Sequence, residues 1–168
     1  NYLIKNWLGA NQLSCLYGAS NTGKSFLALD MSWHIATGRE WNGNKVVQGV
    51  VLYMATEGGN SFRNRVYALK DHYGDENALL AVRPSPVDMF NSDVDLPTLE
   101  NLCSEIRNEK GEIALIVVDT LSRAMAGANE NTSEDMSQFI KNCDILRNIS
   151  KRSPDDSPPH WQGYCQRC

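Results

Sequence analysis

The chain alternates between short apolar runs and longer stretches in which apolar residues recur every three or four positions. The short runs are too brief for helices and predict buried parallel strands, whereas the longer stretches predict helices with one apolar face. The predicted strands span residues 13–17, 49–54, 79–82 and 113–120. The predicted helices span residues 26–38, 60–73, 99–107 and 136–149. Strands that alternate with helices indicate an α/β domain with a mostly parallel sheet.

The segments between these elements are predicted as loops. Residues 37–49 carry three glycines, residues 83–97 carry three prolines, and residues 122–134 are polar. Thr132 and Asp135 form a capping-box pattern in front of the last helix. That helix is expected to pack in the core through Met136, Phe139, Ile140, Cys143, Leu146 and Ile149.

The composition is that of a single soluble domain. A chain of 168 residues with 42% hydrophobic residues is long enough to bury a core. The longest apolar run, residues 113–118, is too short to span a membrane, and no signal peptide opens the sequence, so a cytoplasmic protein is expected. The net charge of −4 argues against a strongly basic nucleic-acid-binding surface but leaves a local patch or an oligomeric channel open. Five cysteines, an odd number in apolar segments, predict reduced core thiols.

The strongest chemical signal is the stretch of residues 18–25, which has the pattern G-x-x-x-x-G-K-[ST]. Its glycines let backbone N–H groups turn toward an anion, and the helix that follows adds the positive end of its dipole. Lys24 is expected to reach the β and γ phosphates of ATP, and the Ser25 hydroxyl is expected to ligate Mg²⁺. The candidate nucleotide-binding residues are Gly18, Ala19, Ser20, Asn21, Thr22, Gly23, Lys24, Ser25 and Phe26.

Two acidic residues at strand ends complete the candidate site. Asp119 ends the apolar strand 113–120, an arrangement in which an aspartate holds Mg²⁺ opposite the hydroxyl of the loop. Glu57 follows the strand 49–54, at the edge where ligands of open α/β sheets bind. Its position fits either a carboxylate that polarises the attacking water or a turn residue before two glycines.

Three further features are open to alternatives. Residues 1–9 fit either an edge strand or a flap near the nucleotide. Trp41 is expected to anchor packing, and stacking on a base is the alternative. Arg63 and Arg65, on the predicted helix 60–73, fit either solvated charges or contacts with phosphate or a neighbouring subunit.

Three stretches carry a family resemblance: YGASNTGKSFLALDMSWHIATGREW, GVVLYMATEGG and LIVVDTLSRAMAGANENTSEDM. Together they resemble the RecA-like ATPase domain of the RepA-type helicases and related AAA-type ATPases of plasmids and phages. The resemblance implies a P-loop NTPase fold with a RecA-like, mostly parallel sheet flanked by helices. It implies phosphate and Mg²⁺ roles for Lys24 and Ser25, the catalytic-base position for Glu57 and the Walker B role for Asp119. Arg123 falls in the D-T-L-x-R stretch of the family, and its role stays open.

The function implied by the resemblance is that of a homo-hexameric ATPase, the motor domain of a replicative DNA helicase that contacts single-stranded DNA. An arginine of the neighbouring subunit would stabilise the transferred charge. The alternative is a nucleotide-binding regulatory or recombination-mediator module with little motor activity. A GTPase or small-molecule kinase is less favoured, because residues 119–122 lack the glycine that GTPases place three residues after this aspartate, and no Asn-Lys-x-Asp motif occurs.

The sequence departs from the family pattern after residue 150. Relatives continue into a buried strand that ends in a run such as His-His-Ser/Thr-Gly-Lys-Asp beside the γ-phosphate, whereas residues 152–168 carry prolines and a cluster of His, Trp and Cys. The expected organisation is an incomplete ATPase core over residues 1–150 and an irregular tail over residues 151–168, which a frame shift in that strand would explain. A zinc site at His160, Cys165 and Cys168 is the rival interpretation, and it lacks a fourth ligand. Loss of the strand predicts weak ATP hydrolysis.

Overall fold

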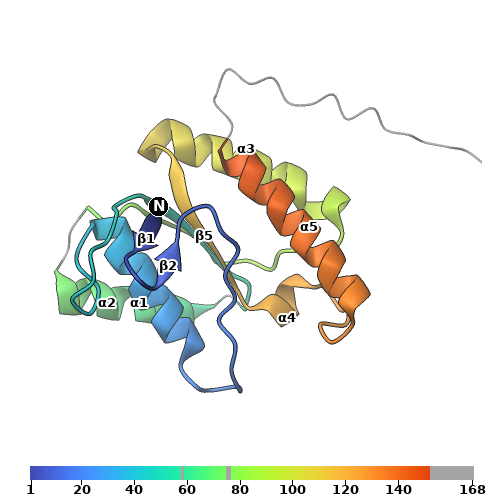
Figure 1. The fold of residues 1–168 in the computed structure, drawn as a ribbon, viewed down its shortest axis with the longest axis horizontal. Coiled ribbons are helices and arrows are strands. Elements are labelled where there is room, and N and C mark those ends of the chain that lie inside the picture. The colour runs from blue at the N-terminus through green and yellow to red at the C-terminus, as the bar shows by residue number, and fades with distance from the viewer. Residues whose placement is uncertain (58, 75–76, 152–168) are drawn as a thin grey trace, which may run out of the picture.

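A three-stranded parallel sheet forms the centre of the fold, between two groups of helices (Figure 1). The structure is a computed structural model and describes residues 1–57, 59–74 and 77–151. Strand β3 (Val50–Ala55) lies between β4 (Leu80–Arg83) and β5 (Ile113–Asp119). Every residue of β3 is buried, as expected for a parallel strand that is covered on both faces.

Helices cover both faces of this sheet. The clusters of buried side chains place α1 (Lys24–Thr37) and α2 (Asn60–Tyr73) on one face. They place α3 (Ser92–Lys110) and α5 (Ser133–Ser150) on the other, with the short α4 (Leu121–Ala124) directly after β5. Within the described part of the chain, no helix has both the length and the apolar character that crossing a bilayer requires.

The alternation of side chains along β3 decides which residues face which helices. Val50, Leu52 and Met54 pack against α3 and α5, so Tyr53, which lies between two of them, points to the side of α1 and α2. The register of the sheet pairs Tyr53 with Val117 and Ala55 with Asp119. Tyr53 and Asp119 therefore lie on the α1 side of neighbouring strands, close to the carboxyl ends of both.

The N-terminal residues form a small hairpin of their own. Strands β1 (Tyr2–Ile4) and β2 (Leu8–Gly9) pair antiparallel, and Ile4 bridges to Val46. Ile4 is fully buried and packs with Ile35, near the C-terminal end of α1 and away from residues 18–25. The hairpin is therefore neither an edge strand of the main sheet nor a flap over the predicted loop.

Most of the predicted elements are confirmed. The predicted helix 60–73 coincides with α2, and the predicted strands 49–54, 79–82 and 113–120 match β3, β4 and β5 to within one residue at each end. Trp41 is a packing anchor, as predicted, with 2% of its surface exposed. The mostly parallel α/β architecture with flanking helices is likewise confirmed.

The strand predicted over residues 13–17 is wrong. Residues 12–19 have no regular secondary structure, and the chain between β2 and α1 follows an irregular path (Figure 1). Leu13, Leu16 and Tyr17 are 53%, 47% and 96% exposed. An apolar run becomes a strand only where a neighbouring strand offers a ladder of hydrogen-bond partners, and none of the described strands pairs with this segment.

The loop predicted over residues 83–97 is too long, because α3 already begins at Ser92. The Asp88 carboxylate accepts hydrogen bonds from the backbone N–H groups of Phe90 (2.9 Å) and Asn91 (2.8 Å), which orders the chain just before the helix. Two aspartates in the first turn add a favourable interaction with the helix dipole. Pro97 lies in the second turn, where it removes a single backbone hydrogen bond and is tolerated.

Smaller corrections concern α4, α5 and the cysteines. The short helix α4 (Leu121–Ala124) occupies the start of the loop predicted over residues 122–134. The predicted cap of α5 is present, since the Thr132 hydroxyl accepts the backbone N–H of Asp135 at 3.4 Å. Ile140, expected in the core, is 39% exposed, because it lies at the border of the apolar face of α5. Cys103 is buried as predicted, whereas Cys15 is exposed in the irregular segment before α1.

The expectations for the tail fall outside the described residues. Lys151 is the last residue that the structure describes. The irregular tail over residues 151–168, its frame-shifted origin and the zinc site at His160, Cys165 and Cys168 therefore stay predictions.

Candidate functional site

The predicted phosphate-binding loop, residues 18–25, leads directly into α1. Asn21 and Gly23 have φ angles of 62° and 86°, in the left-handed region that glycine adopts without strain. No described side chain caps the N-terminus of α1, and its first turn holds no acidic residue. The first backbone N–H groups of the helix, which have no partner inside the helix, are thus directed at whatever lies in front of the loop.

Lys24 folds back onto the loop that precedes it. Its Nζ donates hydrogen bonds to the carbonyl oxygens of Gly18 (2.8 Å) and Ala19 (2.6 Å). The Thr22 hydroxyl donates to the same Ala19 carbonyl at 2.8 Å. These contacts hold the loop curved and place a positive charge on it. Both features favour an anion.

Ser25, in the first turn of α1, meets Asp119 at the end of β5. The Ser25 hydroxyl donates a hydrogen bond to Asp119 Oδ1 at 3.0 Å, and the hydroxyl of the buried Tyr53 donates to Asp119 Oδ2 at 2.8 Å. Burial and the neighbouring carboxylate raise the pKa of Tyr53 well above its usual range, so the phenol keeps its proton and acts as a donor. The two sequence motifs, which lie far apart in the chain, are therefore in direct contact.

Thr56 fixes the backbone at the end of β5. Its hydroxyl donates to the carbonyl oxygen of Asp119 and accepts the backbone N–H of Thr120, both at 2.9 Å. The backbone N–H of Thr56 donates to the same Asp119 carbonyl at 2.7 Å. Thr56 is 3% exposed, so these bonds are shielded from water. They lock the carboxyl ends of β3 and β5 together and determine where the Asp119 side chain begins.

Several other predicted residues are more exposed than Tyr53 and Asp119. Glu57 directly follows Thr56 and is exposed, so its backbone lies beside the Asp119 segment while its side chain is open to solvent. Phe26 is 60% exposed, and the Arg65 guanidinium carbon lies 4.6 Å from the centre of its ring. Arg63 and Arg123 are exposed on α2 and α4.

The residues present fit a magnesium ion that is shared with a phosphate. The hydrogen of the Ser25 hydroxyl is directed to Asp119, which leaves the oxygen lone pairs to a cation. Among the described residues no group of three or more His, Cys, Asp or Glu side chains that could hold a metal ion gathers. Mg²⁺ commonly takes one or two protein oxygens together with phosphate oxygens and water, which matches this donor set.

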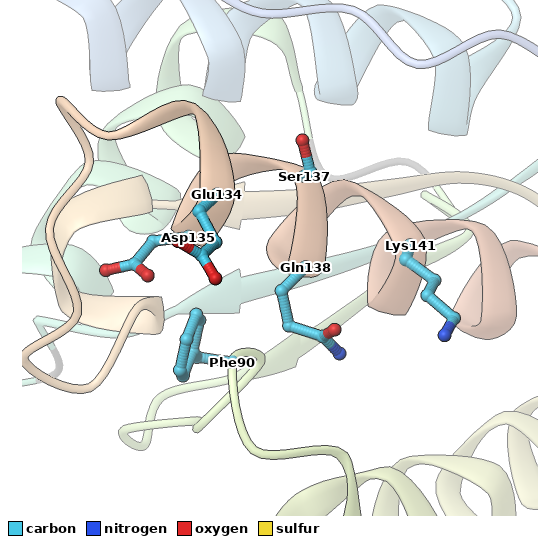
Figure 2. A pocket seen from close by; sticks show the side chains of 6 residues that line it. All are labelled: Phe90, Glu134, Asp135, Ser137, Gln138 and Lys141. Carbon is cyan, nitrogen blue, oxygen red and sulfur yellow. The ribbon is translucent and has the colours of Figure 1, made fainter.

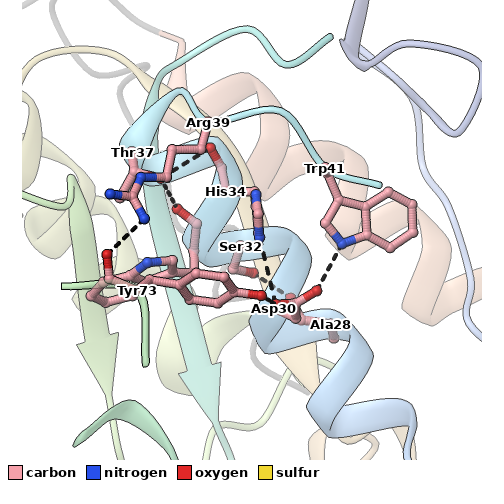
Figure 3. A network of polar contacts seen from close by, with 9 residues as sticks. Ala28, Asp30, Ser32, His34, Thr37, Arg39, Trp41 and Tyr73 are labelled. Atoms are coloured by element: carbon pink, nitrogen blue, oxygen red, sulfur yellow. Dashed lines mark hydrogen bonds and ion pairs between the residues drawn. The ribbon is translucent and has the colours of Figure 1, made fainter. Parts of the chain in front are cut away.

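A polar network anchors α1, the helix that carries Lys24 and Ser25 (Figure 3). Asp30 accepts hydrogen bonds from the Tyr73 hydroxyl and from Trp41 Nε1, both at 2.8 Å. His34 Nε2 lies 3.7 Å from the same carboxylate. The network joins α1 to the end of α2 and to the loop that contains Trp41. It is structural, and it fixes the helix behind the predicted loop.

A surface pocket of about 400 Å³ lies on the opposite side of the sheet, against the first half of α5 (Figure 2). Phe90 forms one wall, and Glu134, Asp135, Gln138 and Lys141 line the helix side. The Asp135 carboxylate is engaged by the backbone N–H of Asn129 at 2.8 Å. Two carboxylates against one lysine disfavour a phosphate, so this pocket is not a second candidate for a nucleotide.

Sequence reasoning found Ser25 and Asp119 but missed Tyr53 and Thr56. Tyr53 resembles an ordinary core residue in a β-branched run, and Thr56 resembles a turn residue. The alternation of side chains along β3 gave a usable signal, because it places Tyr53 on the same face of the sheet as Ala55, at the strand end two residues before Glu57. The hydroxyl contact itself depends on the register between β3 and β5, which no local pattern encodes.

A comparison with known protein families found a match over most of the chain. A protein-family model described as an AAA domain matches residues 1–151. Searches of curated proteins and of solved structures found no match. The family match spans the loop, α1, the sheet and the end of α5.

Proposed function

Because the chain belongs to the AAA domain family, we propose that residues 18–25 and Asp119 hold ATP and Mg²⁺, and that the domain hydrolyses this ATP as the motor of a replicative DNA helicase. Membership of the family indicates nucleotide binding and hydrolysis. The helicase role, and the origin in a phage or mobile element, rest on the resemblance of the three sequence stretches to RepA-type ATPases.

The observation that carries the proposal is the hydrogen bond from the Ser25 hydroxyl to Asp119 Oδ1, at 3.0 Å. It joins a loop that favours anions to a carboxylate that favours cations. A nucleoside triphosphate with a divalent ion requires an anion site and a cation site in one place. An anion site without this carboxylate would suit phosphate or sulfate alone.

The proposed roles follow from the positions of the side chains. The backbone N–H groups at the start of α1 and the Lys24 ammonium bind the β and γ phosphates, once Lys24 exchanges its loop carbonyls for phosphate oxygens. Ser25 and Asp119 hold Mg²⁺, which when bound neutralises charge on those phosphates. Glu57, exposed next to the anchored Thr56, orients the attacking water and accepts its proton.

Assembly and DNA contact are the finer parts of the proposal. The net charge of −4 leaves single-stranded DNA to a local surface or to a channel formed by several copies, and a homo-hexamer would provide such a channel. Arg123, exposed on α4 directly after the Asp119 segment, is available to a neighbouring subunit as the residue that stabilises the transferred charge.

Steady-state ATP turnover tests the proposal, measured with and without single-stranded DNA and over a range of protein concentrations. Lys24→Ala should lower turnover about 100-fold or more, as does the loss of a charge-stabilising donor in other enzymes. Glu57→Gln should lower turnover by a factor of roughly 10²–10⁴ while ATP still binds, because only the proton acceptor is removed. Lys45→Ala and Glu130→Gln make the same changes at exposed positions away from the loop and should leave turnover unchanged.

The outcomes separate the candidate functions. Turnover that rises with single-stranded DNA and with protein concentration supports a ring-forming motor. Binding of ATP without appreciable turnover in either condition favours the regulatory or recombination-mediator module. Full activity in Glu57→Gln would show that another group activates the water.

A further inference from the structure

We propose that Tyr53 is the positioning residue for Asp119, and that its hydroxyl sets the orientation in which this carboxylate meets a nucleotide-bound divalent cation. The inference rests on the proposed function, because it concerns the metal side of the same site. It adds a residue to which neither the sequence motifs nor the family match gives a role.

The side chain of Tyr53 extends through the core to the site. Its ring is completely buried on the α1 side of β3, in a cluster with Leu29, Ala55 and Phe62. The rings of Tyr53 and Phe62 are 4.9 Å apart, centre to centre. Apolar neighbours therefore fix the ring, and only the hydroxyl at its far end meets polar atoms.

That hydroxyl has one close acceptor. It lies 2.8 Å from Asp119 Oδ2, whereas the backbone carbonyl of Ser25 lies at 3.5 Å, the limit of a hydrogen bond. A neutral donor to an ionised carboxylate makes a stronger hydrogen bond than a neutral pair does. The phenol hydrogen is therefore committed to Asp119.

The two oxygens of Asp119 consequently have different donors from different elements. Ser25, from α1, donates to Oδ1, and Tyr53, from the centre of β3, donates to Oδ2. One donor would leave the carboxylate free to rotate about its last bond, but two donors on opposite oxygens fix its plane. Ser25 is itself expected to contact the cation, so Tyr53 is the donor that stays in place whether or not the ion is bound.

The register of the sheet explains why a residue on β3 can do this. Tyr53 pairs with Val117, and Asp119 lies two residues further along β5, on the same face. Such diagonal neighbours on adjacent strands are within reach of a long aromatic side chain. Leucine or valine at position 53 would fill the same core volume only in part, and phenylalanine would fill it without the donor.

Tyr53→Phe tests the inference, because it removes one oxygen atom and keeps the ring. The readout is the dissociation constant of ATP measured with Mg²⁺ and again with EDTA. The strengthening by Mg²⁺ is the ratio of the dissociation constant in EDTA to that with Mg²⁺. We expect this ratio to be about tenfold smaller in Tyr53→Phe, since the loss of groups that orient a metal ligand typically costs 10–100-fold in metal affinity. The dissociation constant in EDTA should change less than about twofold, because the loop and Lys24 are untouched.

Tyr73→Phe is the matched control. It also removes a phenol hydroxyl that donates to a carboxylate at 2.8 Å, but that carboxylate is Asp30, in the anchoring network of α1. Its Mg²⁺ dependence should equal that of the unaltered chain. A loss of the same size in both variants would mean that a general loosening of the fold is responsible, and would overturn the inference.

A double-mutant cycle shows whether Tyr53 acts through Asp119. In the Asp119→Asn background, Tyr53→Phe should have no further effect on the strengthening by Mg²⁺, because the group that it orients is already altered. Additive effects would overturn the inference. If Tyr53→Phe does not fold, 4-aminophenylalanine in place of Tyr53 keeps a weaker donor, and it should weaken the Mg²⁺ dependence in the same direction but to a smaller extent. An unchanged dependence would then overturn the inference.

The experiment also separates the inference from the function on which it rests. If the unaltered chain binds no ATP, the proposed function fails and the inference fails with it. If it binds ATP more tightly with Mg²⁺, and Tyr53→Phe does so to the same extent, the function stands and only the role of Tyr53 is wrong.

Discussion

Replacing Thr56 with valine is the most informative perturbation of the architecture around Asp119. The substitution keeps the branched shape of the side chain and removes the hydroxyl. In the structure that hydroxyl donates to the Asp119 carbonyl and accepts the Thr120 N–H, each at 2.9 Å. The Asp119 carbonyl keeps a second donor, the Thr56 backbone N–H at 2.7 Å. Thr56→Val therefore leaves one group without its partner, the backbone N–H of Thr120.

The expected loss of stability follows from this one backbone N–H that loses its partner. A shielded N–H group that loses its acceptor costs roughly 1–3 kcal/mol, and a lost hydrogen bond whose acceptor is still satisfied costs less. The added methyl group recovers part of this at a site that is 3% exposed. We expect the free energy of unfolding to fall by about 2 kcal/mol. For a chain of this size that corresponds to a decrease of roughly 4–8 °C in the unfolding midpoint.

Urea unfolding, followed by circular dichroism, measures the loss. The transition should move to lower urea at an unchanged slope, because the surface exposed on unfolding stays the same. Thr37→Val is the matched control, since the Thr37 hydroxyl donates to the Trp33 carbonyl within α1 at 2.8 Å and accepts no backbone N–H from residues 1–57, 59–74 or 77–151. It should change the stability by less than about 0.5 kcal/mol. Equal stabilities of Thr56→Val and Thr37→Val would refute the reasoning that Thr56 locks the two strand ends.

Two further predictions concern the rest of the fold. Asp30→Ala removes the acceptor of Trp41 Nε1 and of the Tyr73 hydroxyl, so the free energy of unfolding, measured by thermal unfolding, should fall by roughly 2–4 kcal/mol. Asp30→Asn keeps one acceptor oxygen and should lose less stability. Equal losses would contradict a role based on hydrogen bonding. Burial raises the pKa of Cys103 to about 11, so its thiol stays protonated at pH 8. Iodoacetamide should therefore modify the exposed Cys15 and spare Cys103 in the folded chain, and peptide mass mapping that finds Cys103 modified first would contradict the packing of α3.

The elements that sequence reasoning predicted well are those whose environment is uniform along their length. Strand β3 is apolar throughout because it is the central strand and is covered on both faces. Strand β5 lies at the edge of the described sheet, but its first six residues, 113–118, are also apolar, and both runs stand out from the rest of the chain. Helix α2 ends at Tyr73 because Gly74, with φ of 94°, stops it. The positions of Ser25 and Asp119 were predictable for other reasons, because Ser25 ends the pattern G-x-x-x-x-G-K-[ST] and Asp119 ends an apolar strand.

The segment before α1 shows why apolar pattern alone is insufficient. Residues 13–17 have the composition of a buried strand, but a strand also needs a neighbour with which to pair, and pairing is a property of the whole sheet. Strand β5 pairs with β3, and no further described strand pairs with it. Leu13 and Tyr17 consequently remain on the surface.

The polar contacts of the site could not be predicted from the sequence, for a related reason. The Tyr53 hydroxyl meets the Asp119 carboxylate, and the Thr56 hydroxyl meets the Asp119 backbone carbonyl, only because the register places Ala55 beside Asp119. A slip of one residue would turn Tyr53 toward α3 and α5 and break both contacts. Local sequence determines which residues are candidates, and the register determines which of them touch.

Calorimetric titration of ATP into the chain, with Mg²⁺ and then with EDTA, tests the central claim most directly, namely that the loop and Asp119 form one site for a metal-bound triphosphate. The account predicts saturable binding, with a dissociation constant between about 1 µM and 1 mM, that weakens at least tenfold when Mg²⁺ is removed. In Asp119→Asn the weakening on removal of Mg²⁺ should be smaller than in the unaltered chain. Absence of heat with ATP and Mg²⁺, or an affinity in the unaltered chain that does not depend on the metal, would contradict the claim.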